Sequence, residues 1–208
     1  ISGGVRLTGA LVGTPFVNLA IILIGTFLAS WMGTTGAAML LIRPLINANK
    51  HRKSIVHIIV FFIFLVANIG GSLTPLGDPP LFLGFLKGVD FFWTTTAMFV
   101  PMLIMIIALS IIFYFLDSYY LKKEDIKVEA PQEKLKLGIE GVFNLGLIVG
   151  VIGAVLISGF WKPHISFEVY SGFHLELQNL TRDILLLILT YISWTYTPRQ
   201  IRKDNEYT

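Results

Sequence analysis

Long uncharged runs separated by short charged segments organise the first half of the chain. No charged residue occurs from Leu7 to Ile42, a run of 36 residues. One helix crosses the hydrocarbon core of a bilayer with about 20 residues, whereas two helices and their turn need more than about 40. The run is too long for one span and short for two. Its length therefore favours a re-entrant helical hairpin, which enters and leaves the membrane on the same side.

Proline and glycine positions indicate where this hairpin begins and turns. Pro15 fits the first turn of a helix, where its missing N–H costs nothing, and GTTG at Gly33–Gly36 is typical of a tight turn. We expect two short arms, about 15–31 and 37–46, in a hairpin over residues 15–46. Its tip must be buried in protein or line a watery cavity, because irregular backbone is not tolerated against lipid. A plain loop between two spanning helices is the alternative.

The second uncharged run, residues 54–86 apart from Asp78 and His57, is interrupted by NIGGSLTPLGDPP at 68–80. As one straight helix this run would be about 50 Å long, against a hydrocarbon core of about 30 Å. A helix starting at its first residue climbs about 21 Å, beyond the midplane, before the motif begins. An extramembrane turn at the motif is the alternative, but it leaves the preceding helix too short to span. We therefore expect a broken helix over 54–87.

Prolines in this motif predict carbonyl oxygens without helical partners. Pro75, Pro79 and Pro80 have no N–H, so the carbonyls four residues back, on Gly71, Pro75 and Leu76, lose their helical donors. An unsatisfied carbonyl in hydrocarbon costs several kcal/mol, unless another group replaces the lost partner. A dehydrated cation is suited to that role.

Side chains in the motif add further oxygen ligands for a cation. The Asn68 amide and the Ser72 and Thr74 hydroxyls are hard ligands, and Asp78 adds a carboxylate. An ionisable residue at membrane depth is a functional candidate by default, here as a ligand, a proton carrier or both. We expect Asn68, Thr74 and Asp78 to be the sodium ligands.

The hairpin tip offers the complementary chemistry. Thr34 and Thr35 supply hydroxyls, and Gly33 and Gly36 expose backbone. The helix that we expect to begin near Ala37 presents a partial positive charge, which suits an anionic group. A hairpin tip that faces a broken helix, a construction typical of secondary transporters, would form a two-sided site.

The remainder of the chain alternates between apolar spans and polar segments. Residues 1–121 form the expected first-half transport unit, which ends with a span, and residues 138–208 begin a second half. The expected segments are a span at 92–121, a charged cytoplasmic linker at 122–137, a span at 138–161, an extracytoplasmic loop at 162–182, a short apolar segment at 184–197 and a basic tail. The 14 residues of the short segment leave open whether it crosses the membrane.

Composition and charge agree with a polytopic, all-α integral membrane protein. Hydrophobic residues make up 54% of the 208, and only 14% are charged, against about a quarter in soluble domains. Lysine and arginine number four at 43–53, five at 122–136 and three after residue 198, but one and two in the alternate segments. The positive-inside rule makes the three richer segments cytoplasmic. Basic residues in short clusters do not indicate nucleic-acid binding, and the absence of cysteine excludes thiolate chemistry.

Two motifs resemble the ion-transporter superfamily, which groups sodium/proton antiporters, arsenite permeases, and citrate and dicarboxylate transporters. They are ASWMGTTGAAMLLIRPLI at 29–46 and VANIGGSLTPLGDPPLFLGF at 66–85. The sequence is most similar to a bacterial branch described as sodium/proton antiporters or citrate transporters. The resemblance covers most of residues 1–161. It implies a re-entrant hairpin, an unwound helix beside it, sodium held by backbone oxygens of both, and elevator-type movement in a homodimer.

The resemblance also assigns site residues and shows two departures. Relatives often carry serine–asparagine–threonine or aspartate–asparagine at the tip where this chain has GTT, and asparagine where it has Leu81. No second glycine–proline interruption of this quality follows residue 100, so we expect a truncated or split transporter with one half-site. The candidate ion- and substrate-binding residues are Gly33, Thr34, Thr35, Gly36, Asn68, Gly70, Gly71, Ser72, Thr74, Pro75, Gly77 and Asp78.

These features predict a cation-coupled secondary transporter of the inner (plasma) membrane rather than an enzyme, since no hydrolase arrangement occurs within the spans. Sodium/proton antiport is the leading hypothesis, because a carboxylate such as Asp78 that binds either sodium or a proton couples the two fluxes. Sodium- or proton-coupled citrate or carboxylate transport is an alternative, as is a non-transporting membrane subunit. The expected partners are the bilayer, sodium as coupling ion, and a proton or small carboxylate. No cofactor and no nucleic acid are expected.

Overall fold

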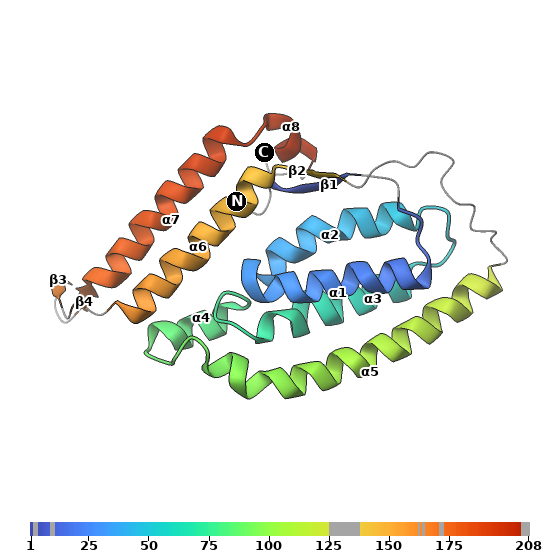
Figure 1. Cartoon of the computed structure of the whole chain (residues 1–208), viewed down its shortest axis with the longest axis horizontal. Helices are drawn as coiled ribbons and strands as arrows, with labels where there is room; N and C mark the ends of the chain where they lie inside the picture. Colours follow the sequence, from blue (N-terminus) through green and yellow to red (C-terminus); the bar gives the residue numbers. More distant parts are fainter. Residues whose placement is uncertain are drawn as a thin grey trace.

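The computed structural model describes residues 1, 4–8, 11–124, 138–161, 163, 165–170 and 173–204. Helices make up most of this part of the chain, and the strands there form two short antiparallel pairs (Figure 1). The helices are α1 Pro15–Met32, α2 Thr34–Ala48, α3 Val56–Phe62, the π-helical η2 Ile63–Asn68, the 3-10 helix η3 Ile69–Ser72, α4 Pro79–Leu86, α5 Trp93–Lys123, α6 Val142–Phe160, α7 Leu177–Tyr196 and α8 Arg199–Asp204. The strands are β1 Arg6–Thr8, β2 Gly138–Glu140, β3 Ser166–Tyr170 and β4 Phe173–Glu176. The all-α prediction is confirmed.

Three of the described helices, α1, α5 and α6, are long and apolar enough to cross a membrane. The longest of them, α5, exposes apolar side chains along most of its length, and its buried residues are only Thr94, Met102, Phe113 and Asp117. So large an exposed apolar surface needs an apolar solvent. The protein is an all-α membrane protein.

The first two helices form an antiparallel hairpin, as expected, but its turn is shorter than predicted (Figure 1). Gly33 alone joins them, with φ 83° and ψ 149°, a conformation that glycine adopts without strain. The prediction of a tip over Gly33–Gly36 is therefore wrong in extent, because Thr34–Gly36 form the first turn of α2. At 1.5 Å per residue α1 is about 27 Å long, and re-entrance remains a prediction. The expected start is confirmed, with Pro15 at the first position and the Thr14 hydroxyl accepting from the Val17 amide at 3.3 Å.

The second run forms a broken helix. The α-helix widens to a π-helix after Phe62 and tightens to 3-10 geometry over η3, and an irregular segment at 73–78, the unwound segment, separates this helix from α4. Helical geometry thus continues further into the glycine- and proline-rich motif than the sequence predicted. This helix packs closely on α1, since a Cβ on Gly70 would lie 2.8 Å from the Ala29 Cβ and from the Thr26 carbonyl oxygen.

A core joins the hairpin to the broken helix and α5. Its largest fully buried apolar side chains come from α1, α2, α3, η2 and α5, among them Ile22, Leu45, Phe62, Leu65 and Phe113. The hairpin is therefore packed on two neighbouring elements along its length. This packing holds the tip beside the unwound segment.

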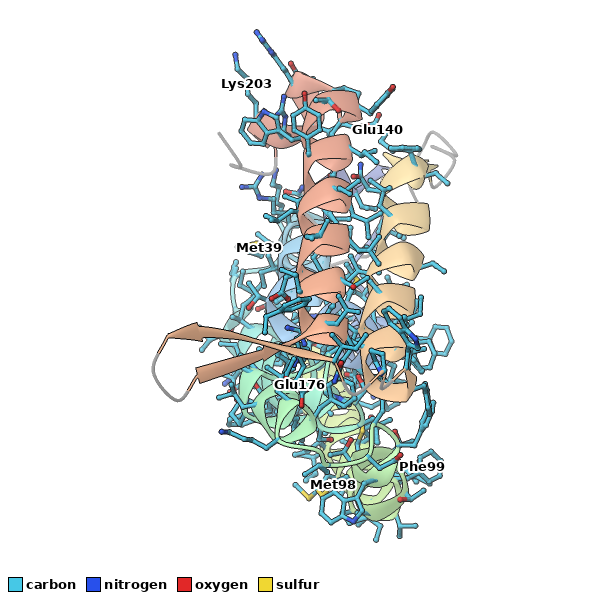
Figure 2. All side chains as sticks on the ribbon, turned by 90° about the vertical axis from the view of Figure 1, so that its left-hand side faces the viewer. Met39, Met98, Phe99, Glu140, Glu176 and Lys203 are labelled. Carbon is cyan, nitrogen blue, oxygen red and sulfur yellow. The ribbon has the colours of Figure 1, made fainter. Side chains whose placement is uncertain are left out.

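The second part of the chain is an antiparallel pair of long helices, α6 and α7, which lie side by side (Figure 2). Residues 177–182, expected in a loop, are the first turns of α7, which at 20 residues is about 30 Å long and includes the short apolar segment 184–197. The β3–β4 pair accounts for most of the described residues in the rest of the expected loop. Most of the expected linker and the end of the expected basic tail, residues 125–137 and 205–208, lie outside the described residues.

Contacts between distant segments bring together the starts of α1 and α6 and the ends of α5 and α7. Strand β1, just before α1, pairs with β2, just before α6, with Arg6 opposite Glu140. The end of α7 joins this region, because the Thr197 hydroxyl accepts from the Asn144 amide of α6 at 2.9 Å. The beginning of α1 and the end of α5 meet where the Asn18 amide donates to Asp117 at 3.0 Å.

Candidate ion and substrate site

The hairpin tip contacts the unwound segment through backbone atoms. The Thr34 amide donates to the Gly77 carbonyl at 3.2 Å. A Cβ on Gly33 would lie 3.5 Å from the Leu76 carbonyl oxygen, and a Cβ on Gly71 would lie 2.7 Å from the Thr34 methyl group. The structure thus brings together residues that lie about 40 positions apart in the sequence. Their proximity requires glycine at Gly71, where a side chain would displace the tip.

A second set of bonds fixes the unwound segment to the last turn of α1. The Ser30 hydroxyl donates to the Gly70 carbonyl at 2.5 Å, and the Thr74 hydroxyl donates to the Ser30 carbonyl. Ser30 is fully buried and Thr74 is 1% exposed. Ser30 was missed by the sequence reasoning, although a lone hydroxyl three residues before the tip glycine was a usable signal.

Two threonines of α5 also hold the unwound segment. The hydroxyls of Thr94 and Thr95 donate to the Leu73 carbonyl at 3.1 and 2.6 Å. The sequence reasoning missed both residues and assigned this part of the chain only to the start of a span. Three threonines in succession at Thr94–Thr96, at the start of an apolar run, were the available signal. Side chains from two other helices therefore satisfy part of the backbone that the helix break releases.

Other polar backbone groups at the contact have no partner among the described residues. On the tip, the amides of Thr35 and Gly36, in the first turn of α2, donate no hydrogen bond. On the unwound segment, the carbonyls of Gly71, Pro75 and Leu76 accept none, as the proline positions predicted. Donors therefore lie on one side of the contact and acceptors on the other. The donors suit an anionic group, and the acceptors suit a cation.

Asp78 lies at the end of the unwound segment as the N-cap of α4. An aspartate at this position normally accepts from the second or third amide of its helix, but the Asp78 carboxylate caps nothing. The cause is local, because Pro79 and Pro80 have no N–H and the Leu81 amide donates to the Asp78 carbonyl at 3.1 Å. The exposed carboxylate is therefore available for a ligand.

The side chains of three predicted site residues do not join the contact. The exposed Asn68 donates back to the Ile63 carbonyl at 2.8 Å, and the Ser72 hydroxyl donates to Ile69 at 2.9 Å. Both bonds are local to the broken helix. Thr35 is exposed, and its hydroxyl makes no hydrogen bond with the described residues. Of the expected sodium ligands, Thr74 alone is buried, and its hydroxyl is already bonded to Ser30.

A positive charge from the second part of the chain approaches α4. The Arg182 guanidinium of α7 lies over the Phe82 ring, 5.5 Å from its centroid and one turn along α4 from Asp78. Arg182 is 6% exposed and pairs with Asp183 at 2.7 Å. Its charge is therefore largely compensated. Beyond it, a cleft of about 710 Å³, lined in part by Lys87, Asp90 and Gln178, contains none of the predicted site residues.

Replacing Ser30 with alanine should loosen the contact without unfolding the protein. The change removes the donor to the Gly70 carbonyl but leaves the Ser30 carbonyl that accepts from Thr74. A buried neutral hydrogen bond contributes about 1 kcal/mol, so we expect a loss of that order in thermal unfolding. Ser158→Ala is the matched control, because its buried hydroxyl bonds only within α6, to Val155 at 2.8 Å. An equal loss in both variants would contradict a special role for Ser30.

Comparison with known proteins agrees with a transporter. The whole chain, residues 1–208, matches the protein family described as "Putative citrate transport". No curated protein and no solved structure matches the chain. The match supports the citrate-transporter side of the resemblance and a transporter rather than an enzyme. The chain belongs to this citrate transport family.

Proposed function

We propose that the protein transports citrate or a related small carboxylate together with cations across the membrane. The observation that supports this most directly is the pairing of unsatisfied groups at the contact. Amides of Thr35 and Gly36 are available to a carboxylate, and carbonyls of Gly71, Pro75 and Leu76 are available to a cation. A site with both kinds of group suits the joint binding of an anion and a cation.

Charge explains why cations must accompany citrate at such a site. Citrate is a multiply charged anion at neutral pH, whereas the tip offers only neutral amides and the partial charge of a helix N-terminus. Arg182 does not make up the difference, because Asp183 pairs with it. Transfer of an uncompensated anion to a low-dielectric site is strongly unfavourable. Sodium ions or protons bound by the unwound segment and Asp78 would supply the missing positive charge.

Sodium/proton antiport is a second candidate, and one observation favours it. Asp78 is the one acidic residue in the broken helix, and its carboxylate makes no capping bond. A carboxylate that binds sodium or a proton, but not both, exchanges the two ions without an organic substrate. In that case the tip amides would bind no organic substrate.

Uptake into vesicles distinguishes the two candidates. Purified protein in proteoliposomes should accumulate labelled citrate when sodium, or a proton gradient, is supplied, and should not do so when both are absent. Magnesium in place of sodium tests whether a divalent cation can accompany citrate. Recovery of an acid-quenched dye on sodium addition, without citrate uptake, would instead support antiport. A chain inactive in both assays, with no stabilisation by sodium or citrate, would favour a non-transporting membrane subunit.

We also propose an orientation and an assembly for the transporter. The positive-inside rule places the basic clusters at 43–53, 122–136 and 199–203 on the cytoplasmic face of the inner membrane, with the chain crossing it several times. The exposed apolar side chains of α5 would then face lipid or a second copy of the chain. A homodimer is the assembly that the superfamily resemblance favours.

A further inference from the structure

A buried polar cluster, separate from the candidate site, lies at the open end of the hairpin. Its members are Asn18 of α1, Asn49 after α2, Arg52 before α3, His57 of α3 and Asp117 of α5. Each is at most 9% exposed, and the Asp117 side chain is fully buried. Buried polar groups at this density need mutual satisfaction, and a buried charge needs a paired one. In this cluster the buried charge is paired, since Arg52 lies against Asp117, while His57 Nδ1 has no hydrogen-bond partner among the described residues.

Asp117 is the centre of the cluster. One carboxylate oxygen lies 2.6 Å from an Arg52 guanidinium nitrogen and 2.7 Å from His57 Nε2, and the other accepts from the Asn18 amide at 3.0 Å. Arg52 also donates to the Asp117 carbonyl at 3.3 Å. The His57 ring stacks on Tyr120 of α5, with 4.6 Å between centroids. One side chain of α5 thus binds residues of α1, of the α2–α3 connection and of α3.

Asn18 connects this carboxylate to both arms of the hairpin. It exchanges two hydrogen bonds with Asn49, at 3.0 and 2.7 Å, and Asn49 also donates to the Leu45 carbonyl of α2 at 2.8 Å. The arms are therefore joined to each other and to α5 at the same point. A second acidic side chain, that of Glu124 just after α5, strengthens the connection, since it accepts from the backbone amides of Lys53 and Ser54, the latter at 2.7 Å.

The hairpin can transmit a shift at this end to its tip. Asn18 is 15 residues from Gly33, so about 22 Å of continuous helix separates the cluster from the turn. The turn is a single residue and leaves no flexible loop to absorb a displacement. At the tip, a shift of about 1 Å would break the hydrogen bond from the Thr34 amide to the Gly77 carbonyl. It would also separate the Thr34 methyl group from Gly71. The position of the tip therefore depends on where the open end is held.

We propose that Asp117 is a positioning residue for transport, which fixes the open end of the α1–α2 hairpin on α5 and so sets how the tip meets the unwound segment. This proposal rests on the proposed function in one respect, namely that the tip lies at the transport site. Its test does not require a transported species to be known.

Thiol labelling provides that test, because the chain contains no cysteine. Thr34→Cys places one thiol beside Gly71, and Ala154→Cys places a reference thiol on α6, where the residue is 4% exposed. In detergent-solubilised protein, adding Asp117→Asn to each should speed maleimide labelling of the Thr34→Cys thiol at least tenfold. Labelling of the Ala154→Cys thiol should stay unchanged. Equal rates at Thr34→Cys with and without Asp117→Asn, or equal acceleration at both thiols, would overturn the proposal.

Two further variants separate positioning from stability. Ser110→Ala removes a hydroxyl of α5 whose oxygen is buried without a hydrogen-bond partner among the described residues, so labelling at Thr34→Cys should not change.

Asn18→Ser replaces Asp117→Asn if the latter does not yield folded protein. It removes the connection between Asp117 and the two arms while Arg52 and His57 still satisfy the carboxylate. We expect a severalfold acceleration at Thr34→Cys alone. Failure of citrate uptake in the parent protein would refute the proposed function and leave the labelling result intact, so the two proposals fail independently.

Discussion

Gly77→Ala should abolish transport and lower the free energy of unfolding by about 3 kcal/mol or more, the upper range for overpacking. A Cβ at this position would lie 2.2 Å from the Gly71 carbonyl oxygen and 2.7 Å from the Gly71 Cα. Both are backbone atoms and cannot rotate away, so the unwound segment must move. Because the Gly77 carbonyl accepts from the Thr34 amide, the movement also separates the tip from the segment. Thermal unfolding and vesicle uptake measure the two effects.

Gly153→Ala is the matched control for this prediction. Gly153 lies inside α6, and a Cβ there would meet no atom within 4 Å. Alanine is favoured over glycine inside a helix by about 0.5–1 kcal/mol, so the variant should be at least as stable as the parent and equally active. A Gly77→Ala protein that unfolds and transports like Gly153→Ala would show that the packing of Gly71 on Gly77 is not needed for the site.

Local patterns in the sequence predicted the features that depend on neighbouring residues. Pro15 predicted the start of α1, and the prolines of the motif predicted both the break and the unpartnered carbonyls, because proline acts on its own backbone and on the residue before it. The extent of the turn was less predictable. Gly33 suffices to reverse the chain, so Thr34 and Thr35 became helical where a four-residue loop was expected.

Features that depend on distant residues were not predictable from these patterns. Asp117 lies 60 residues from His57 and 99 from Asn18, and each of these residues alone is typical of the end of a membrane span. The hydrogen bond of Ser30 was unpredictable for the same reason, since its acceptor, the Gly70 carbonyl, lies 40 residues away in the sequence. An asparagine in a glycine-rich motif looked like a ligand, but π-helical geometry turned Asn68 back onto Ile63.

The site that results is built mainly from backbone. Glycine at Gly71 and Gly77 permits the approach, hydroxyls of α1 and α5 satisfy part of the released backbone, and the remaining amides and carbonyls stay available. Such groups have fixed directions but no net charge. Selectivity between ions must therefore depend on the few ionisable groups nearby, and Asp78 is the nearest of these along the chain.

Asp78→Asn should reduce cation-driven uptake at least tenfold and leave stability unchanged. Among the described residues its carboxylate makes no hydrogen bond and no ion pair, so an amide of the same shape removes no contact from the fold. It does remove the negative charge that would attract sodium or carry a proton. Uptake of labelled citrate, or sodium-driven proton release, measured over a range of sodium concentrations reports the loss.

Asp90→Asn is the matched control for the Asp78→Asn prediction. Asp90 is also exposed and lies just beyond α4, but its carboxylate accepts from the Phe92 amide at 2.8 Å, a bond that asparagine can keep. This variant should transport like the parent. Equal uptake by Asp78→Asn and the parent at every sodium concentration would remove Asp78 from the mechanism. Coupling would then have to arise from the backbone carbonyls of Gly71, Pro75 and Leu76 alone, which bind a sodium ion but cannot exchange it for a proton, and antiport would be excluded with it.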